Sequence, residues 1–64
     1  MYRFKTEIPI KINKTSACEI IGLSRSVLSN ILNGKVNCRK VTAFSITKYL
    51  DNNAEIEDYF IKQD

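Results

Sequence analysis

The sequence predicts a small, mainly helical domain that begins with a β-strand or hairpin. The chain has 64 residues, enough for one domain with a small core. Apolar and polar residues alternate over residues 2–13, the period of a half-buried strand, and then apolar residues recur every three or four positions, the period of amphipathic helices. We therefore expect a single domain over residues 1–64, with an N-terminal strand segment (1–12), a helix-turn-helix (13–34) and supporting helices (35–64).

The composition excludes disordered, membrane-spanning and secreted classes. The chain is 44% hydrophobic and 27% charged, as in folded proteins. Its longest apolar run covers residues 20–23, far short of the roughly 20 residues of a membrane span. Nothing in residues 1–13 resembles a secretory signal. We expect a cytoplasmic protein with no membrane partner.

The chain lacks the side chains that most catalytic and metal sites need. It contains no His, the usual general base and metal ligand. Cys18 and Cys38 are twenty residues apart and have neither CxxC nor Cys/His zinc spacing, so we expect reduced, structural thiols. The acidic residues Glu55, Glu57 and Asp58 have no partner that suggests a catalytic pair. The sequence thus predicts no enzyme, no metal site and no cofactor.

The predicted N-terminal strand covers residues 2–12. Aromatic and β-branched residues occupy its even positions, and mostly charged residues occupy its odd positions. Pro9 cannot donate to a strand ladder, so it marks an edge position or a break between two short strands. Two arrangements are open. The strand edge pairs with a second copy as an antiparallel dimer ribbon, or the strand folds back on its own helices, for instance as a hairpin around residues 7–9.

The segment that follows carries signals for two helices joined by a tight turn. Asn13 is a suitable N-cap, and Gly22 is the residue type best tolerated at the positive φ that ends a helix. Ser24 caps the second helix, and Asn33-Gly34 closes it. The apolar residues that give each helix a core-facing side are Ala17, Cys18 and Ile21 in the first, and Val27, Leu28, Ile31 and Leu32 in the second.

Two further helices are expected after a basic linker. The third runs from about residue 41 to residue 50, and the polar run 51–53 ends it. A last short helix is predicted over residues 54–62. The residues expected to point inward from it are Ile56, Tyr59 and Phe60. The acidic residues of its first turn, which favour the helix dipole, are Glu55, Glu57 and Asp58.

The charges are unevenly distributed along the chain. Residues 1–40 hold eight Lys or Arg and two Glu, a net charge of +6. Residues 41–64 hold two Lys and five acidic residues, a net charge of −3. We therefore expect a polyanionic partner on the N-terminal two-thirds of the chain.

The two-helix segment also has a distinctive spacing of residue types. A small residue, Cys18, stands four positions before Gly22, and large aliphatic residues flank that glycine. The second helix opens with Ser24 and ends in Asn33-Gly34. In these positions the segment resembles the helix-turn-helix of the phage repressor/Cro-type (XRE-like) DNA-binding family. The resemblance covers about residues 13–60 and implies a lambda repressor-like helical domain.

The chain departs from that family upstream of the motif. The family normally begins with an arginine-bearing helix that packs over the motif, where this chain has the strand pattern. Ile20 also occupies a position that is usually polar and exposed in the family. An apolar residue there favours coverage of that helix face by the N-terminal strand.

The resemblance also implies which side chains contact DNA. In helix-turn-helix proteins the second helix lies in the major groove with its N-terminal residues at base edges. The implied base-reading residues are Arg25, Ser26, Ser29 and Asn30. The implied phosphate contacts lie at the start of the first helix and in the basic linker, and they are Lys14, Thr15, Lys35, Asn37, Arg39 and Lys40. The alternative for each of them is a solvated polar surface.

These expectations combine into one function. The chain is expected to be a sequence-specific, double-stranded DNA-binding transcriptional regulator, a repressor of phage or mobile-element type that binds an inverted repeat as a homodimer. Regulation would come from protein concentration or from a regulatory protein partner. The alternative is a protein-binding inhibitor or antirepressor module on the same scaffold, which the acidic C-terminal residues favour. An architectural or excisionase-type DNA bender is a third interpretation.

Overall fold

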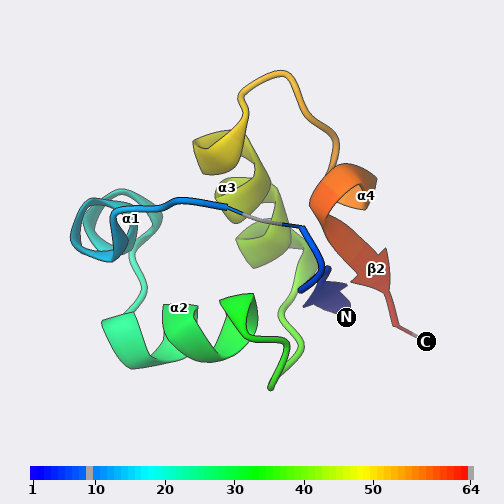
Figure 1. Ribbon diagram of the computed structural model, residues 1–64, viewed down its shortest axis with the longest axis horizontal. Helices are drawn as coiled ribbons and strands as arrows, with labels where there is room; N and C mark the ends of the chain where they lie inside the picture. Colours follow the sequence, from blue (N-terminus) through cyan, green and yellow to red (C-terminus); the bar gives the residue numbers. More distant parts are fainter. Residues whose placement is uncertain (9, 64) are drawn as a thin grey trace.

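The chain folds in the order β1 (Tyr2–Phe4), α1 (Lys14–Ile21), α2 (Arg25–Leu32), α3 (Lys40–Leu50), α4 (Ile56–Tyr59) and β2 (Phe60–Lys62) (Figure 1). This computed structural model describes residues 1–8 and 10–63. The break predicted at Pro9 lies outside the described residues. The coarse prediction is confirmed, since the domain is small and mostly helical and has a strand near its N-terminus.

The sheet joins the two ends of the chain. β1 and β2 pair antiparallel, with Phe4 opposite Phe60 and Tyr2 opposite Lys62. On its other side, Tyr2 exchanges two backbone hydrogen bonds with Cys38, at 2.7 and 2.8 Å. The hairpin around residues 7–9 is therefore wrong, because the partner of β1 comes from the far end of the sequence. β1 also has little free edge for a dimer ribbon.

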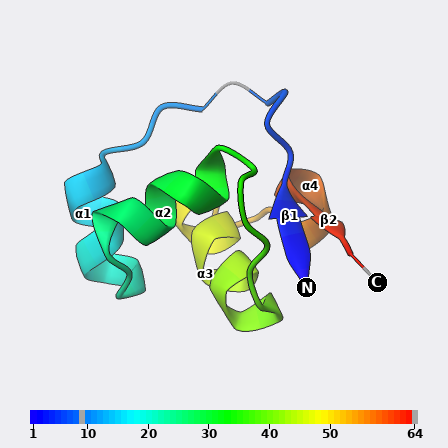
Figure 2. The same cartoon turned by 90° about the horizontal axis from the view of Figure 1, so that it is seen from below.

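The strand predicted over residues 2–12 ends at Phe4. Lys5 N–H still donates to Tyr59 O at 2.8 Å, and the chain then turns and runs as an extended loop to α1 (Figure 2). Ile10 and Ile12 on this loop are half-buried against the core. The period of two thus arises from a segment that crosses the core surface, and a strand needs a partner ladder that β2 is too short to supply.

Local signals define the ends of α1 and α2 as expected. Asn13 Oδ1 accepts from Ser16 N–H at 3.1 Å, and Ser24 Oγ accepts from Val27 N–H at 3.2 Å. Gly22, at φ +87°, ends α1 and donates its N–H to Cys18 O. A non-glycine residue is strained in this left-handed region, so the turn glycine has the conformational role predicted for it.

The C-terminal part of the prediction is correct up to Tyr59 and wrong after it. α3 covers the predicted third helix, and Glu55 caps α4 in a capping box with Asp58. Residues 60–62 are a strand, where a helix was predicted. Burial decides this, because the extended conformation lets Phe60 pack edge-on against the Phe4 ring, with centroids 5.3 Å apart.

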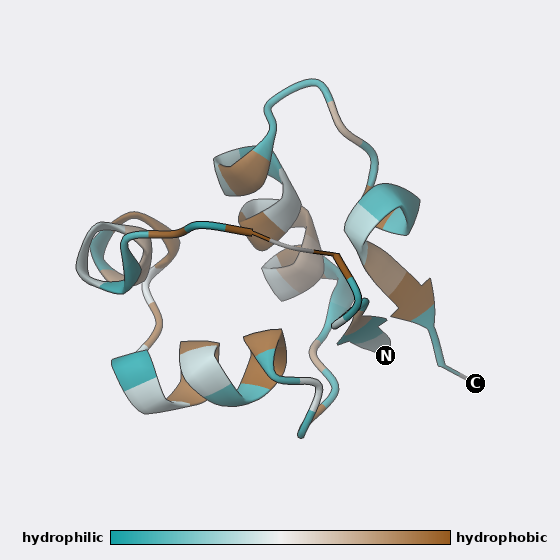
Figure 3. Ribbon diagram, viewed as in Figure 1, coloured by the Kyte–Doolittle hydropathy of each residue, from teal (hydrophilic) through white to brown (hydrophobic). Residues whose placement is uncertain are grey.

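One core connects the helices to the sheet. The largest fully buried side chains are Phe60, Leu28, Ile46 and Thr47. Leu28 and Ile31 pack in one cluster with Ala17, as predicted, and Cys18 and Ile21 lie half-buried at its margin. Apolar and hydrophilic bands accordingly alternate along α2 and α3 (Figure 3).

The N-terminal segment does not cover Ile20. This side chain is 70% exposed and, with Phe44 at 51%, borders an open groove between α1 and α3. The expectation that the strand covers this helix face is wrong, because β1 is held at the other side of α3 by β2 and Cys38. In the described ranges 1–8 and 10–63, no helix is long and apolar enough to cross a membrane.

Candidate nucleic-acid interface

The N-terminal ends of α1 and α2 border an open depression of about 440 Å³. Its lining residues are Lys14, Arg25, Ser26, Ser29 and Asn30. This set contains all four residues predicted to read bases, together with one of the predicted phosphate contacts. The structure therefore brings the base-reading set together on one surface.

Helix geometry explains why these side chains share a face. Arg25, Ser26, Ser29 and Asn30 occupy positions i, i+1, i+4 and i+5 of α2, which form one stripe of a helix. Leu28 and Ile31 occupy the opposite stripe and are buried. The core thus fixes the rotation of α2, and the polar stripe has to face outward.

Lys14 belongs to the depression although it lies on α1. Its Nζ donates to Ser29 Oγ at 3.5 Å, across the two helices. Asn33 Nδ2 donates to the same hydroxyl at 3.4 Å. The sequence predicts a phosphate contact for Lys14 and only a turn role for Asn33. The i, i+4 spacing of Ser29 and Asn33 on α2 was the available signal for this second contact.

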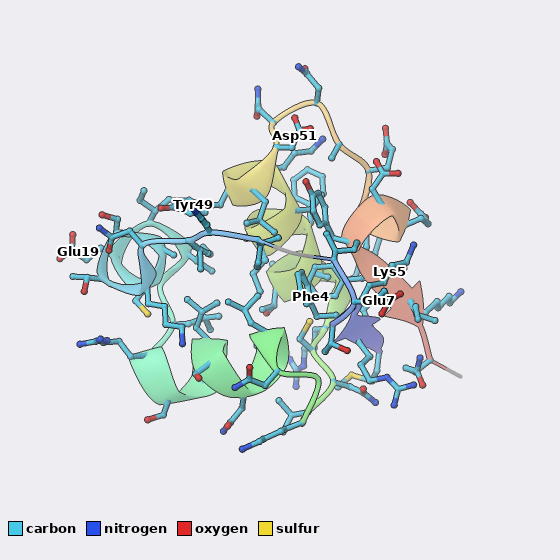
Figure 4. The ribbon with its side chains drawn as sticks, in the orientation of Figure 1. Phe4, Lys5, Glu7, Glu19, Tyr49 and Asp51 are labelled. Carbon is cyan, nitrogen blue, oxygen red and sulfur yellow. The ribbon has the colours of Figure 1, made fainter. Side chains whose placement is uncertain are left out.

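The electrostatics of the depression favour an anion. Its lining holds two cationic side chains, Lys14 and Arg25, and no carboxylate. Figure 4 shows Glu19, an acidic residue of α1, on the outward side of that helix and away from α2. The remaining groups of the lining are hydroxyls and one amide, which donate and accept hydrogen bonds.

The other predicted phosphate contacts form a separate group. Lys35, Asn37, Arg39 and Lys40 are exposed on the segment that leads from α2 into α3. Thr15 is exposed in the first turn of α1. None of these five lines the depression. The candidate interface thus has a base-reading group and a flanking cationic group, connected through α2.

The acidic residues near the C-terminus have structural roles in α4. Glu55 accepts a hydrogen bond from the Asp58 N–H, and Asp58 Oδ2 accepts from the Glu55 N–H at 2.9 Å. The backbone oxygen of Glu57 accepts from Lys5 Nζ at 2.6 Å. These contacts explain why acidic residues occur at this point of the chain.

The cysteines form no disulfide and no metal centre. Cys18 and Cys38 are free thiols, and burial raises the pKa of the Cys38 thiol above its ordinary value, with the N-terminal ammonium acting weakly in the opposite direction. Across the part of the chain that the structure describes, no three His, Cys, Asp or Glu side chains cluster as metal ligands.

No protein-family model matches the chain, and no curated protein or solved structure is significantly similar to it. The resemblance to the phage repressor family therefore stays a prediction from the motif residues.

Proposed function

We propose that the chain is a sequence-specific, double-stranded DNA-binding regulator that acts as a transcriptional repressor, with α2 in the major groove. The observation that supports this function best is the depression that Lys14, Arg25, Ser26, Ser29 and Asn30 line. An exposed helix stripe with cations, hydroxyls and an amide carries the donors and acceptors that base edges require.

The chemistry of two side chains makes the proposal specific. The Arg25 guanidinium is a fork that matches O6 and N7 of guanine, and the Asn30 amide matches N6 and N7 of adenine. Both side chains are exposed at the open end of α2. Each such contact is worth about 1–3 kcal/mol of discrimination against a wrong base pair.

The flanking cationic group supplies affinity without sequence preference. Lys35, Arg39 and Lys40 follow α2 directly, so they reach the sugar-phosphate backbone next to the groove that α2 occupies. Each phosphate contact releases counterions, which makes binding depend on salt.

A homodimer on an inverted repeat is part of the proposal. α2 has only eight residues and four candidate base-reading side chains, so one copy specifies a short site. Two copies related by a two-fold axis read two half-sites about 10 base pairs, or ~34 Å, apart.

The alternative of a protein-binding module has less support. It depended on the acidic residues of the C-terminal part, and the hydrogen bonds of Glu55 and Asp58 give those residues a role in capping α4.

Selection of random duplexes by the purified chain tests the proposed function, and substitutions then separate the two groups of residues. Asn30→Ala and Arg25→Lys should relax the preference at one base pair per half-site, and Arg25→Lys should do so at unchanged charge. Lys35→Ala and Lys40→Ala should weaken binding to all duplexes alike. Each should also lower the salt slope by about one for every phosphate that a copy no longer neutralises.

A matched control is Arg3→Ala, which removes one exposed cation from β1, outside both groups. It should leave the selected sequence unchanged and affect binding less than Lys35→Ala does. Selection that enriches no sequence, together with equal effects of Arg3→Ala and Lys35→Ala, would contradict the proposed function.

A further inference from the structure

We propose that the outer edge of β2 is the seam at which two copies of this chain associate. β1 is paired on both sides, with β2 along one edge and Cys38 at the other. In the described part of the chain, β2 pairs with β1 alone. The proposal depends on the proposed function only where it concerns DNA, since association is measured on the protein without DNA.

The register shows which backbone groups lie on this free edge. Backbone bonds from Lys5 N–H to Tyr59 O and from Gln63 N–H to Met1 O, at 2.8 and 2.7 Å, flank the pair of Arg3 and Ile61. In an antiparallel ladder, the residues between such bonded pairs direct their N–H and C=O to the other side. On β2 these residues are Phe60 and Lys62.

The exposed edge carries a donor and an acceptor at matching positions. The Phe60 N–H already donates to Ile56 O at the end of α4. The Phe60 C=O and the Lys62 N–H remain directed away from β1. In an antiparallel pair of copies with Ile61 opposite Ile61, each Lys62 N–H donates to the Phe60 C=O of the second copy. The two bonds are related by a two-fold axis, so the pair is closed.

Side chains favour the same register. Ile61 is 44% exposed, and in this register it faces its own equivalent in a pair without hydrogen bonds, where Cβ atoms come about 4.5–5.5 Å apart. Lys62 comes opposite Phe60, two residues from Asp58 of the second copy and next to the acidic first turn of its α4. A register shifted by two residues places Lys62 opposite Lys62, which like charges disfavour.

The seam leaves the candidate DNA interface open. β2 lies at one end of the longest axis, which measures 29 Å, and α1 lies at the other end (Figure 1). Two copies joined at the β2 end have centres on the order of one DNA turn, ~34 Å, apart. The edge is only three residues long, so the interface is smaller than the ~800 Å² per partner of stable complexes, and association should be weak.

Sedimentation and ¹⁵N NMR dilution series from micromolar to millimolar protein test the seam. The wild-type chain should form dimers in the upper part of this range, with shifts that depend on concentration at residues 60–62. Ile61→Glu should raise the dissociation constant by at least about tenfold, the equivalent of 1.4 kcal/mol. Ile20→Glu, a matched change at an apolar side chain that is 70% exposed on α1, should leave it unchanged.

Lys62→Pro tests the backbone contact directly. It removes the outward N–H but keeps the bonds through which Ile61 and Gln63 hold β1. A folded, monomeric Lys62→Pro variant supports the seam. A wild-type chain that stays monomeric at millimolar concentration overturns it, as does dissociation by Ile20→Glu but not by Ile61→Glu. Ile61→Glu that still binds a single half-site leaves the proposed function intact, whereas a wild-type dimer without any DNA preference overturns that function and not the seam.

Discussion

The α1–α2 segment and the β1–β2 sheet differ in how far apart their interacting residues are in the sequence. The contacts that end α1 and begin α2 join residues no more than four positions apart, as in the Asn13 cap, the Gly22 turn and the Ser24 cap. The sheet joins Tyr2 to Lys62, and a third segment contributes Cys38. One region follows from short-range chemistry, and the other requires the chain ends to meet.

This difference matters for function because the candidate interface lies on the locally specified region. Arg25, Ser26, Ser29 and Asn30 are aligned by one helix whose cap and turn are encoded beside them. The sheet contributes stability, since Phe4 and Phe60 complete the core on which α2 packs. Substitutions can therefore separate the stability that the sheet supplies from the surface that α2 presents.

The largest expected effect comes from removing the aromatic contact that closes the sheet. Phe4 is 3% exposed, and its ring lies 5.3 Å from Phe60 and 6.4 Å from Tyr59 between centroids. Phe4→Ala should lower the free energy of unfolding by about 3–5 kcal/mol, and Leu28→Ala in α2 by about 2–5 kcal/mol. Either change removes a large part of the stability of so small a domain. Urea unfolding followed by circular dichroism measures both. A Phe4→Ala chain as stable as wild type would mean that the helices fold without the sheet.

The two glycines provide a smaller and sharper contrast. Both have positive φ, but a Cβ at Gly22 meets no atom within 4 Å, whereas a Cβ at Gly34 lies 2.8 Å from Thr6 Cγ2. Gly22→Ala should cost about 1–2 kcal/mol from backbone strain alone. Gly34→Ala should cost about 1 kcal/mol more, because it adds a steric clash.

Thermal melts of the double variants separate strain from clash. Thr6→Ala should recover the additional destabilisation in Gly34→Ala and should change nothing in Gly22→Ala. Equal effects of Thr6→Ala in both backgrounds would contradict the contact between the N-terminal loop and the end of α2.

The helix caps are expected to contribute about 1 kcal/mol each. Asn13→Ala and Ser24→Ala remove side-chain oxygens that accept from Ser16 and Val27 N–H groups. Arg39 is the matched control, because it stands at the N-cap of α3 without a side-chain capping bond. Arg39→Ala should therefore leave the unfolding midpoint within error of wild type. A destabilisation as large in Arg39→Ala as in Ser24→Ala would show that the caps are not the source of the effect.

The smallest effect has the opposite sign. Thr47 is fully buried on α3, and its Oγ1 has no hydrogen-bond partner. Thr47→Val replaces the hydroxyl by a methyl group of similar volume and should raise the free energy of unfolding by up to about 1 kcal/mol. Thr47→Ser keeps the hydroxyl, removes a methyl group and should be destabilising. Calorimetry that shows a lower stability in Thr47→Val would indicate that the hydroxyl is satisfied in solution.

Sequence patterns were sufficient to locate α1, α2 and α3, the caps at Asn13 and Ser24, and the turn at Gly22. They were also sufficient to place the four candidate base-reading residues on one exposed stripe, because a buried Leu28 leaves a single rotation for α2. These features depend on residues within a few positions of one another, so propensity and period carry the information.

Packing between distant segments was needed for the rest. Residues 60–62 have no strong local preference, and they became β2 because Phe60 is buried against Phe4 in an extended conformation. The position of Lys14 beside Ser29 likewise depends on how α1 crosses α2. The free edge of β2 is the counterpart of β1 having partners on both sides. A period of two records which residues are apolar on one side, but the partner of a strand depends on contacts across the whole chain, which no local window contains.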